Sequence, residues 1–135
     1  MSSLYHAHSG LRYLVLLAAV AALGALSYAL ATNRAVRPAR ILSTAFTGLL
    51  DLQILLGITL FLGGKFPDAV VGHLVCMVLA LASTHGSSIV ARRSGGERRE
   101  LAIRLGGIAL ALLLIVVGIM AIGRGVFDSR PLSAG

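Results

Sequence analysis

Four long runs of apolar residues, separated by short polar segments, make up most of this chain. The runs cover residues 11–31, 41–63, 70–91 and 101–123. Each holds about 20 residues, the length that an α-helix needs to cross the hydrocarbon core of a bilayer. Because the connecting segments are short, consecutive helices are expected to lie antiparallel. The pattern predicts an all-α fold in which residues 1–135 form a single domain, an integral membrane antiparallel four-helix bundle.

The composition agrees with a membrane protein and excludes several other classes. Hydrophobic residues make up 57% of the chain and charged residues 13%, whereas soluble domains are nearer to half and a quarter. Cys76 is the single cysteine, so the chain cannot form an internal disulfide. The sequence contains no nucleotide-binding loop, catalytic triad or zinc signature.

The net charge of +7 is placed for membrane anchoring rather than for nucleic-acid binding. Eight of the 12 Lys and Arg residues follow the first and third apolar runs, and they are Arg34, Arg37, Arg40, Arg92, Arg93, Arg98, Arg99 and Arg104. Short loops rich in Lys and Arg face the cytoplasm. The charge pattern therefore predicts a multi-pass protein of the bacterial inner (cytoplasmic) membrane, with both termini on the outer side.

The first candidate site lies at the outer end of the predicted bundle. His8 precedes the first run, and His73 lies about one turn into the third, so their side chains are expected to face each other across the core. Two neutral imidazoles on facing helices are a common way to hold haem iron. Arg12 shares the helix face of His8 and suits a haem propionate. Met77 is an alternative ligand. In the structural alternative no cofactor is bound: His6 and His8 are simply interfacial residues, and His73 bonds a neighbouring carbonyl.

The second candidate site pairs Asp51 with His85. Asp51 is the only carboxylate within the runs, and an unpaired ionised Asp in hydrocarbon costs about 2.5–3.5 kcal/mol. His85 lies at a matching depth, so Asp51 is predicted to point into the bundle and to contact His85 or a hydroxyl of residues 84–88. About 18 Å of helix separates His73 from His85, so the two cannot bind one metal. The pair is either a structural hydrogen bond, a second haem or quinone site, or a proton relay.

Three stretches resemble a family of small four-helix bacterial membrane proteins of the cytochrome b-like type. They are HSGLRYLVLL at 8–17, DLQILLGITLFL at 51–62 and GHLVCMVLALASTHG at 72–86. The resemblance implies haem binding and points to His8, Arg12, Gln53, His73 and His85. Two positions depart from the family pattern, because Gly72 stands where Glu is frequent and Asp51 where His is frequent. The second departure weakens the expectation of a second bis-histidine site.

Together these features predict a small b-type haem membrane protein that transfers electrons and is linked to a quinone pool. The candidate cofactor-binding residues are His8, Arg12, His73, His85 and Asp51, with His8 and His73 as metal ligands and haem b as the cofactor. Expected partners are lipid, quinone or a redox protein, a larger membrane complex or further copies of the chain, but no nucleic acid. The alternatives are a cofactor-free structural or accessory subunit of a respiratory or photosynthetic complex and a pigment-binding subunit.

Overall fold

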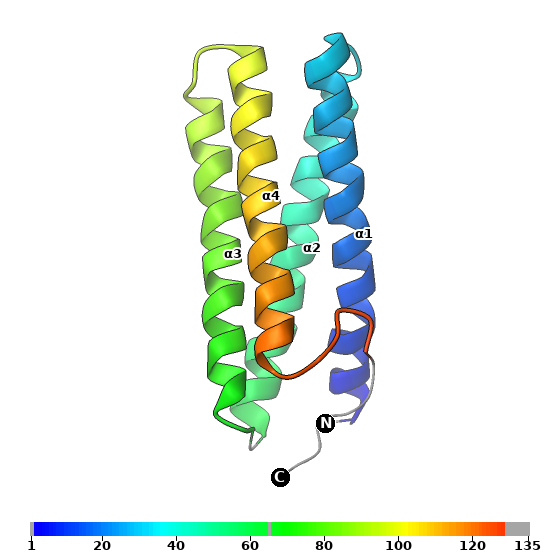
Figure 1. Cartoon of the computed structure of the whole chain (residues 1–135), viewed down its shortest axis with the longest axis vertical. Helices are drawn as coiled ribbons and strands as arrows, with labels where there is room; N and C mark the ends of the chain where they lie inside the picture. Colours follow the sequence, from blue (N-terminus) through cyan, green and yellow to red (C-terminus); the bar gives the residue numbers. More distant parts are fainter. Residues whose placement is uncertain (1, 65, 129–135) are drawn as a thin grey trace.

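The computed structural model describes residues 2–64 and 66–128, which form four long helices joined by short loops (Figure 1). Their bounds are Ser2–Thr32 for α1, Val36–Gly63 for α2, Ala69–Arg92 for α3 and Glu97–Ala121 for α4. The helices run alternately up and down. Each is long and apolar enough to cross a membrane. The predicted all-α fold with four such helices is confirmed.

Three helices begin earlier than the apolar pattern predicts. α1 begins at Ser2 instead of near residue 11, α2 at Val36 instead of 41, and α4 at Glu97 instead of 101. Polar residues continue a helix beyond its apolar run because the backbone hydrogen bonds do not depend on the side chain's polarity. The early start of α1 places His8 within the helix rather than in a polar lead that precedes it.

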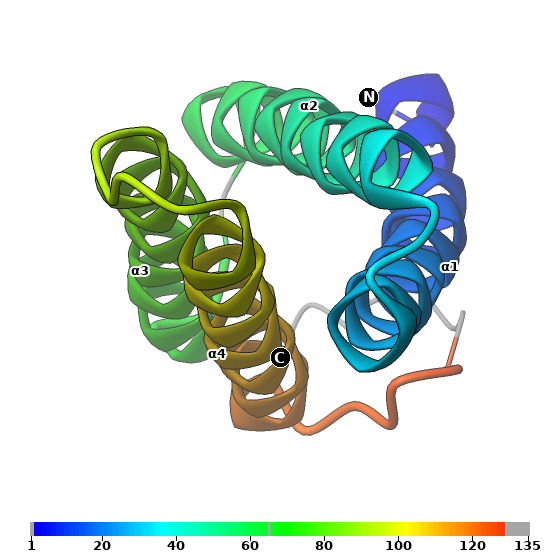
Figure 2. The same cartoon turned by 90° about the horizontal axis from the view of Figure 1, so that it is seen from above.

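The helices form two hairpins that lie side by side (Figure 2). α1 packs along α2, and α3 packs along α4. α1 also contacts α4, whereas α2 and α3 share a smaller interface, and no contact joins α1 to α3 in the described residues. We call the end that holds Ser2 and Asp128 the terminal end, and the opposite end the loop end. α2 and α3 are joined at the terminal end and diverge toward the loop end.

Small residues bring α3 and α4 close together. The Ser83 hydroxyl donates a hydrogen bond of 2.8 Å to the carbonyl oxygen of Gly107. A Cβ on Gly107 would overlap the side chain of Ser87. Gly107 and Ala111, which are four residues apart, are both buried. Small residues four positions apart are typical of membrane helices that pack closely.

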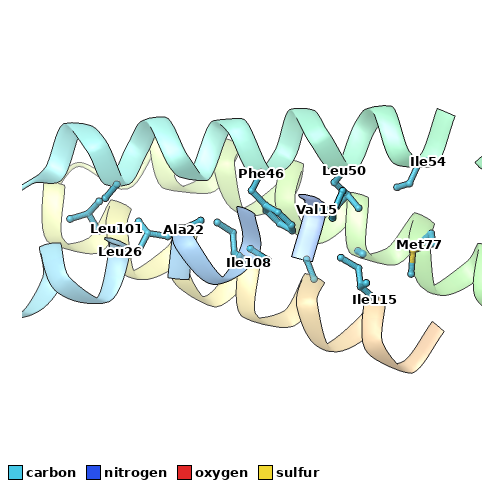
Figure 3. Close-up of a cluster of buried hydrophobic side chains, with 14 of the residues drawn as sticks. Val15, Ala22, Leu26, Phe46, Leu50, Ile54, Met77, Leu101, Ile108 and Ile115 are labelled. Carbon is cyan, nitrogen blue, oxygen red and sulfur yellow. The ribbon is translucent and has the colours of Figure 1, made fainter. Parts of the chain in front are cut away.

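Side chains fill the core toward the loop end (Figure 3). Leu26, Phe46 and Ile108 are fully buried there. Toward the terminal end the core includes Leu50 and Met77, and both of these also border a cavity. The bundle is therefore solid at one end and hollow at the other.

An ion-pair cluster ties α2 to α4 at the loop end. Both carboxylate oxygens of Glu100 accept hydrogen bonds from the Arg40 guanidinium, at 3.1 and 2.6 Å. Arg104 donates to the same carboxylate at 3.1 Å and is buried. The predicted basic loop therefore contains a buried arginine of α4, which the charge pattern alone does not indicate.

Candidate functional site

An apolar cavity opens at the terminal end between the two hairpins. Its empty volume, which includes the solvent-open part, is ≈ 890 Å³. All four helices contribute to its wall. The apolar lining includes Val15, Leu50, Leu60, Met77, Ile115 and Ile119, and the polar lining is Tyr5, His8, Ser9, Arg12, Gln53, His73 and Arg124. The few polar groups in an apolar wall are typical of a binding site for a largely apolar ligand.

His8 lines the cavity from α1 and is fixed against α2. Its Nδ1 donates to the backbone carbonyl of Gln53 at 3.1 Å, and the Gln53 amide donates to the backbone carbonyl of His8 at 2.9 Å. A carbonyl only accepts, so Nδ1 carries the proton and Nε2 of the neutral ring keeps its lone pair. The Gln53 amide nitrogen lies 3.4 Å from that Nε2, at the weak limit of a hydrogen bond. Nε2 is therefore the nitrogen of His8 that is suited to ligation.

Gly57 provides the room that the His8 ring occupies. A Cβ at Gly57 would lie 3.0 Å from Cε1 of His8. We expect Gly57→Val to displace the ring and break its bond to the Gln53 carbonyl, destabilising the protein by about 1–3 kcal/mol. ¹⁵N NMR of the histidines should then lose the signal of a protonated, hydrogen-bonded Nδ1. Gly48→Val is the control, because a Cβ at Gly48 meets no atom within 4 Å. An unchanged His8 signal in Gly57→Val would contradict this account.

His73 lines the same cavity from α3, the helix diagonal to α1. Its Nδ1 donates to the backbone carbonyl of Gly118 on α4 at 3.0 Å. A Cβ at Gly118 would lie 2.8 Å from Cys76 Cβ and 2.9 Å from Met77 Cε, so glycine is what permits this approach. The carbonyl bond expected for a structural histidine and the cavity position expected for a ligand are thus both present.

The two histidines occupy equivalent positions in the two hairpins. Each bonds a carbonyl 45 residues further along the chain, and the positions 8 and 73, and 53 and 118, both differ by 65. The same shift relates the buried residues 39, 46, 50 and 54 of α2 to the buried residues 104, 111, 115 and 119 of α4. The hairpins are therefore a structural repeat, with one imidazole from each half at the cavity. The repeat is not evident in the sequence, because burial recurs at all four positions but only Ile54 and Ile119 are identical residues.

Two arginines line the cavity. Residues 122–128 cross from α4 to α1 (Figure 1), and the Arg12 guanidinium donates to the carbonyl of Asp128 at 2.8 Å. Arg12 is buried, and its Nε is without a hydrogen-bond partner among the described residues. Arg124 donates to the Tyr5 hydroxyl at 2.8 Å. The cavity wall thus carries two positive charges and a buried donor that an acidic group on a ligand would satisfy.

The Asp51–His85 contact is present, but it does not point into the bundle. Nε2 of His85 lies 2.8 Å from Oδ1 of Asp51, which confirms the predicted partner. Their side chains are 46% and 52% exposed for Asp51 and His85, and neither lines the cavity. The predicted inward orientation of Asp51 is therefore wrong. Leu50 and Gln53 hold the inward face of α2, and Asp51 lies about 100° around the helix from Leu50.

The sequence reasoning placed His8, Arg12 and His73 at one end, and the structure brings all three to one cavity. It missed Tyr5 and Arg124, which lie in segments without apolar periodicity. Met77, the alternative ligand, also lines the cavity, whereas His6 is exposed and does not. Among the described residues, no group of three or more His, Cys, Asp or Glu is placed to hold a metal ion. A metal bound by His8 and His73 would therefore need further ligands from its own cofactor.

No protein-family model, curated protein or solved structure matches this chain. The resemblance to the cytochrome b-like family stays a prediction, and the candidate site is defined by its geometry alone.

Proposed function

We propose that this chain is a small b-type haem protein of the membrane that transfers electrons. The proposal depends on one observation. Two imidazoles from diagonal helices line one apolar cavity, and a backbone carbonyl fixes Nδ1 of each, which leaves Nε2 for ligation. Such a hydrogen bond sets the tautomer of a ligating histidine and raises its basicity.

The residues of the cavity fit a haem. His8 and His73 would hold the iron from the protein side, and the macrocycle would supply the remaining ligands. The buried Nε of Arg12 and the guanidinium of Arg124 would bind the propionates. The bound group would supply one-electron transfer. The protein's part is to hold the ligands, to neutralise the propionates and to exclude water with the apolar wall.

A cofactor-free structural subunit is the competing function. Its support is that the bonds to the Gln53 and Gly118 carbonyls already satisfy one nitrogen of each histidine. The apolar cavity wall and the unsatisfied Nε of Arg12 favour a ligand instead. Absorption spectra of the protein purified after expression with added haem precursor test the two. A Soret band that sharpens, with split visible bands on dithionite reduction, supports the haem protein. A colourless protein that also fails to bind added haemin would refute it.

The surface of the bundle supports a location within the bilayer. Large apolar side chains stand exposed on every helix, including Leu17 on α1, Leu55 on α2, Val78 on α3 and Leu113 on α4. Lipid is the solvent in which such a surface carries no penalty. We place the protein in the bacterial inner membrane, with the loop end in the cytoplasm because most of the arginines lie there.

Reporter fusions test this orientation. At Asn33 in the α1–α2 loop, a reporter that works only in the cytoplasm should be active. At the carboxyl terminus, a reporter that works only outside the cytoplasm should be active. The physical reason is the excess of Lys and Arg in the loops at the loop end. The reverse pattern would contradict the orientation and leave the cavity assignment unaffected.

A further inference from the structure

We infer that the Asp51–His85 pair is a binding site for the headgroup of a lipid-soluble quinol. The inference depends on the proposed function only in that a haem in the cavity would be the quinol's redox partner. The evidence is the position of the pair, the space beside it and the atoms of Asp51 and His85 that make no hydrogen bond to the described residues.

The pair lies within the apolar length of the helices, with His85 about 10 Å of helix from the nearer end of α3, and yet it faces outward. Asp51 is about 18 Å of helix from the nearer end of α2, and both side chains are about half exposed. Beyond their mutual bond, Oδ2 of Asp51 and Nδ1 of His85 make no hydrogen bond to the described residues. Polar groups at such a depth are costly without a partner. A molecule dissolved in the membrane is the partner that can reach them.

Packing does not explain the pair. The structural repeat places Val20 of α1 and Val116 of α4 at the positions equivalent to His85 and Asp51. Apolar residues thus occupy these positions at the α1–α4 interface, which is more extensive than the α2–α3 interface that holds the pair. The hydroxyl groups near His85 bond elsewhere. Thr84 donates to Leu81 and Ser87 donates to Thr84, both within α3, and Ser83 donates to Gly107 on α4. They do not support Asp51, so the pair is not part of a buried polar network.

Open space adjoins the pair on both helices. Gly48 lies one turn before Asp51 on the same side of α2, and Gly86 follows His85 directly. A Cβ at either glycine would meet no atom within 4 Å. α2 and α3 also diverge toward the loop end (Figures 1 and 2). A flat ring can therefore lie beside the carboxylate and the imidazole without displacing a side chain.

The chemistry of the pair suits a quinol. A quinol hydroxyl is a donor for the open carboxylate oxygen of Asp51, and a quinone carbonyl is an acceptor for a protonated Nδ1 of His85. The isoprenoid tail would lie along the exposed apolar residues Leu52 and Leu55. Leu50 and Gln53 on the same stretch of α2 line the cavity. The two sites would thus be separated by about one helix diameter, roughly 10 Å.

Photolabelling of the full-length protein in lipid nanodiscs tests the inference. The probe is an azido-benzoquinol, and labelled peptides are mapped by mass spectrometry. We expect labels within residues 47–55 and 82–89. Asp51→Asn and His85→Leu should each weaken probe binding about tenfold or more, because each removes a hydrogen bond to a charged or ionisable group. Asp68→Asn and His6→Ala, which change an exposed carboxylate and an exposed imidazole elsewhere, should bind the probe normally.

Gly48→Leu keeps the pair intact and fills the space beside it. It should abolish labelling while the helix content stays unchanged, which separates loss of the site from loss of the fold. Labels confined to the cavity, or labelling that survives Gly48→Leu, would overturn the inference. So would a dimer in sedimentation experiments that Asp51→Asn dissociates, since the pair would then join two copies of the chain. Haem absorbance of the same samples separates the two proposals. Haem without a label refutes only the quinol site, and a label without haem refutes only the proposed function.

Discussion

Replacing His73 by alanine should remove the Soret band of the haem-loaded protein, and replacing His8 should do the same. Each imidazole would be one of the two protein ligands of the iron, and the Nδ1 of each bonds a backbone carbonyl of the neighbouring helix. Loss of a supporting hydrogen bond alone weakens metal binding by about 10–100-fold. Loss of the ligand itself should exceed that range. Haemin titration of the purified variants, followed by absorbance, measures the change.

Two other histidines provide the controls. His6 lies two residues before His8 but is exposed, and His85 lies on the same helix as His73 but outside the cavity. His6→Ala and His85→Ala should therefore bind haemin as the parent protein does. Far-ultraviolet circular dichroism should show the same helix content in all four variants. An intact Soret band in His73→Ala would show that this histidine is not a ligand and would turn attention to Met77.

The terminal-end site was largely predictable because it depends on depth. Counting residues from the ends of apolar runs places His8, Arg12 and His73 at one level, and a helix has a fixed rise per residue. The pairing of Asp51 with His85 follows from the same reasoning and is confirmed. The side of the helix on which a residue lies cannot be counted in this way. It depends on which helices are neighbours and how far they diverge, and the sequence pattern does not contain that information.

The structural repeat shows a second limit of sequence reading. Arg12 and Met77 hold equivalent buried positions in the two hairpins, and so do Ala19 and Thr84. Because these side chains differ so much, sequence comparison does not detect the repeat, whereas the pattern of burial does. The position of Arg124 at the cavity could not be predicted for another reason. Arg124 belongs to a segment after α4 that has no periodicity, and only its path across to α1 brings it to the cavity.

The two adjacent glycines of α4 should respond to alanine in opposite directions. Gly106 is exposed, and a Cβ there meets no atom within 4 Å. Gly106→Ala should therefore leave stability unchanged or raise it by up to about 1 kcal/mol, the helix-propensity difference. Gly107 is buried against α3, and a Cβ there would overlap Ser87 and lie 3.1 Å from the carbonyl oxygen of Ser83. Gly107→Ala should therefore destabilise the protein by about 1–3 kcal/mol, the usual cost of overpacking.

Ser87 decides whether packing is the cause. The side chain that a Cβ on Gly107 would meet is that of Ser87, so Ser87→Gly should relieve much of the damage in the Gly107→Ala background. Residues in contact show coupling energies of about 0.5–3 kcal/mol in double-mutant cycles, whereas independent sites add. Unfolding of the four proteins by sodium dodecyl sulfate in mixed micelles measures that coupling. Additive effects would mean that α3 and α4 do not meet at this point. A positive coupling would show that α3 and α4 pack closely at Ser87 and Gly107.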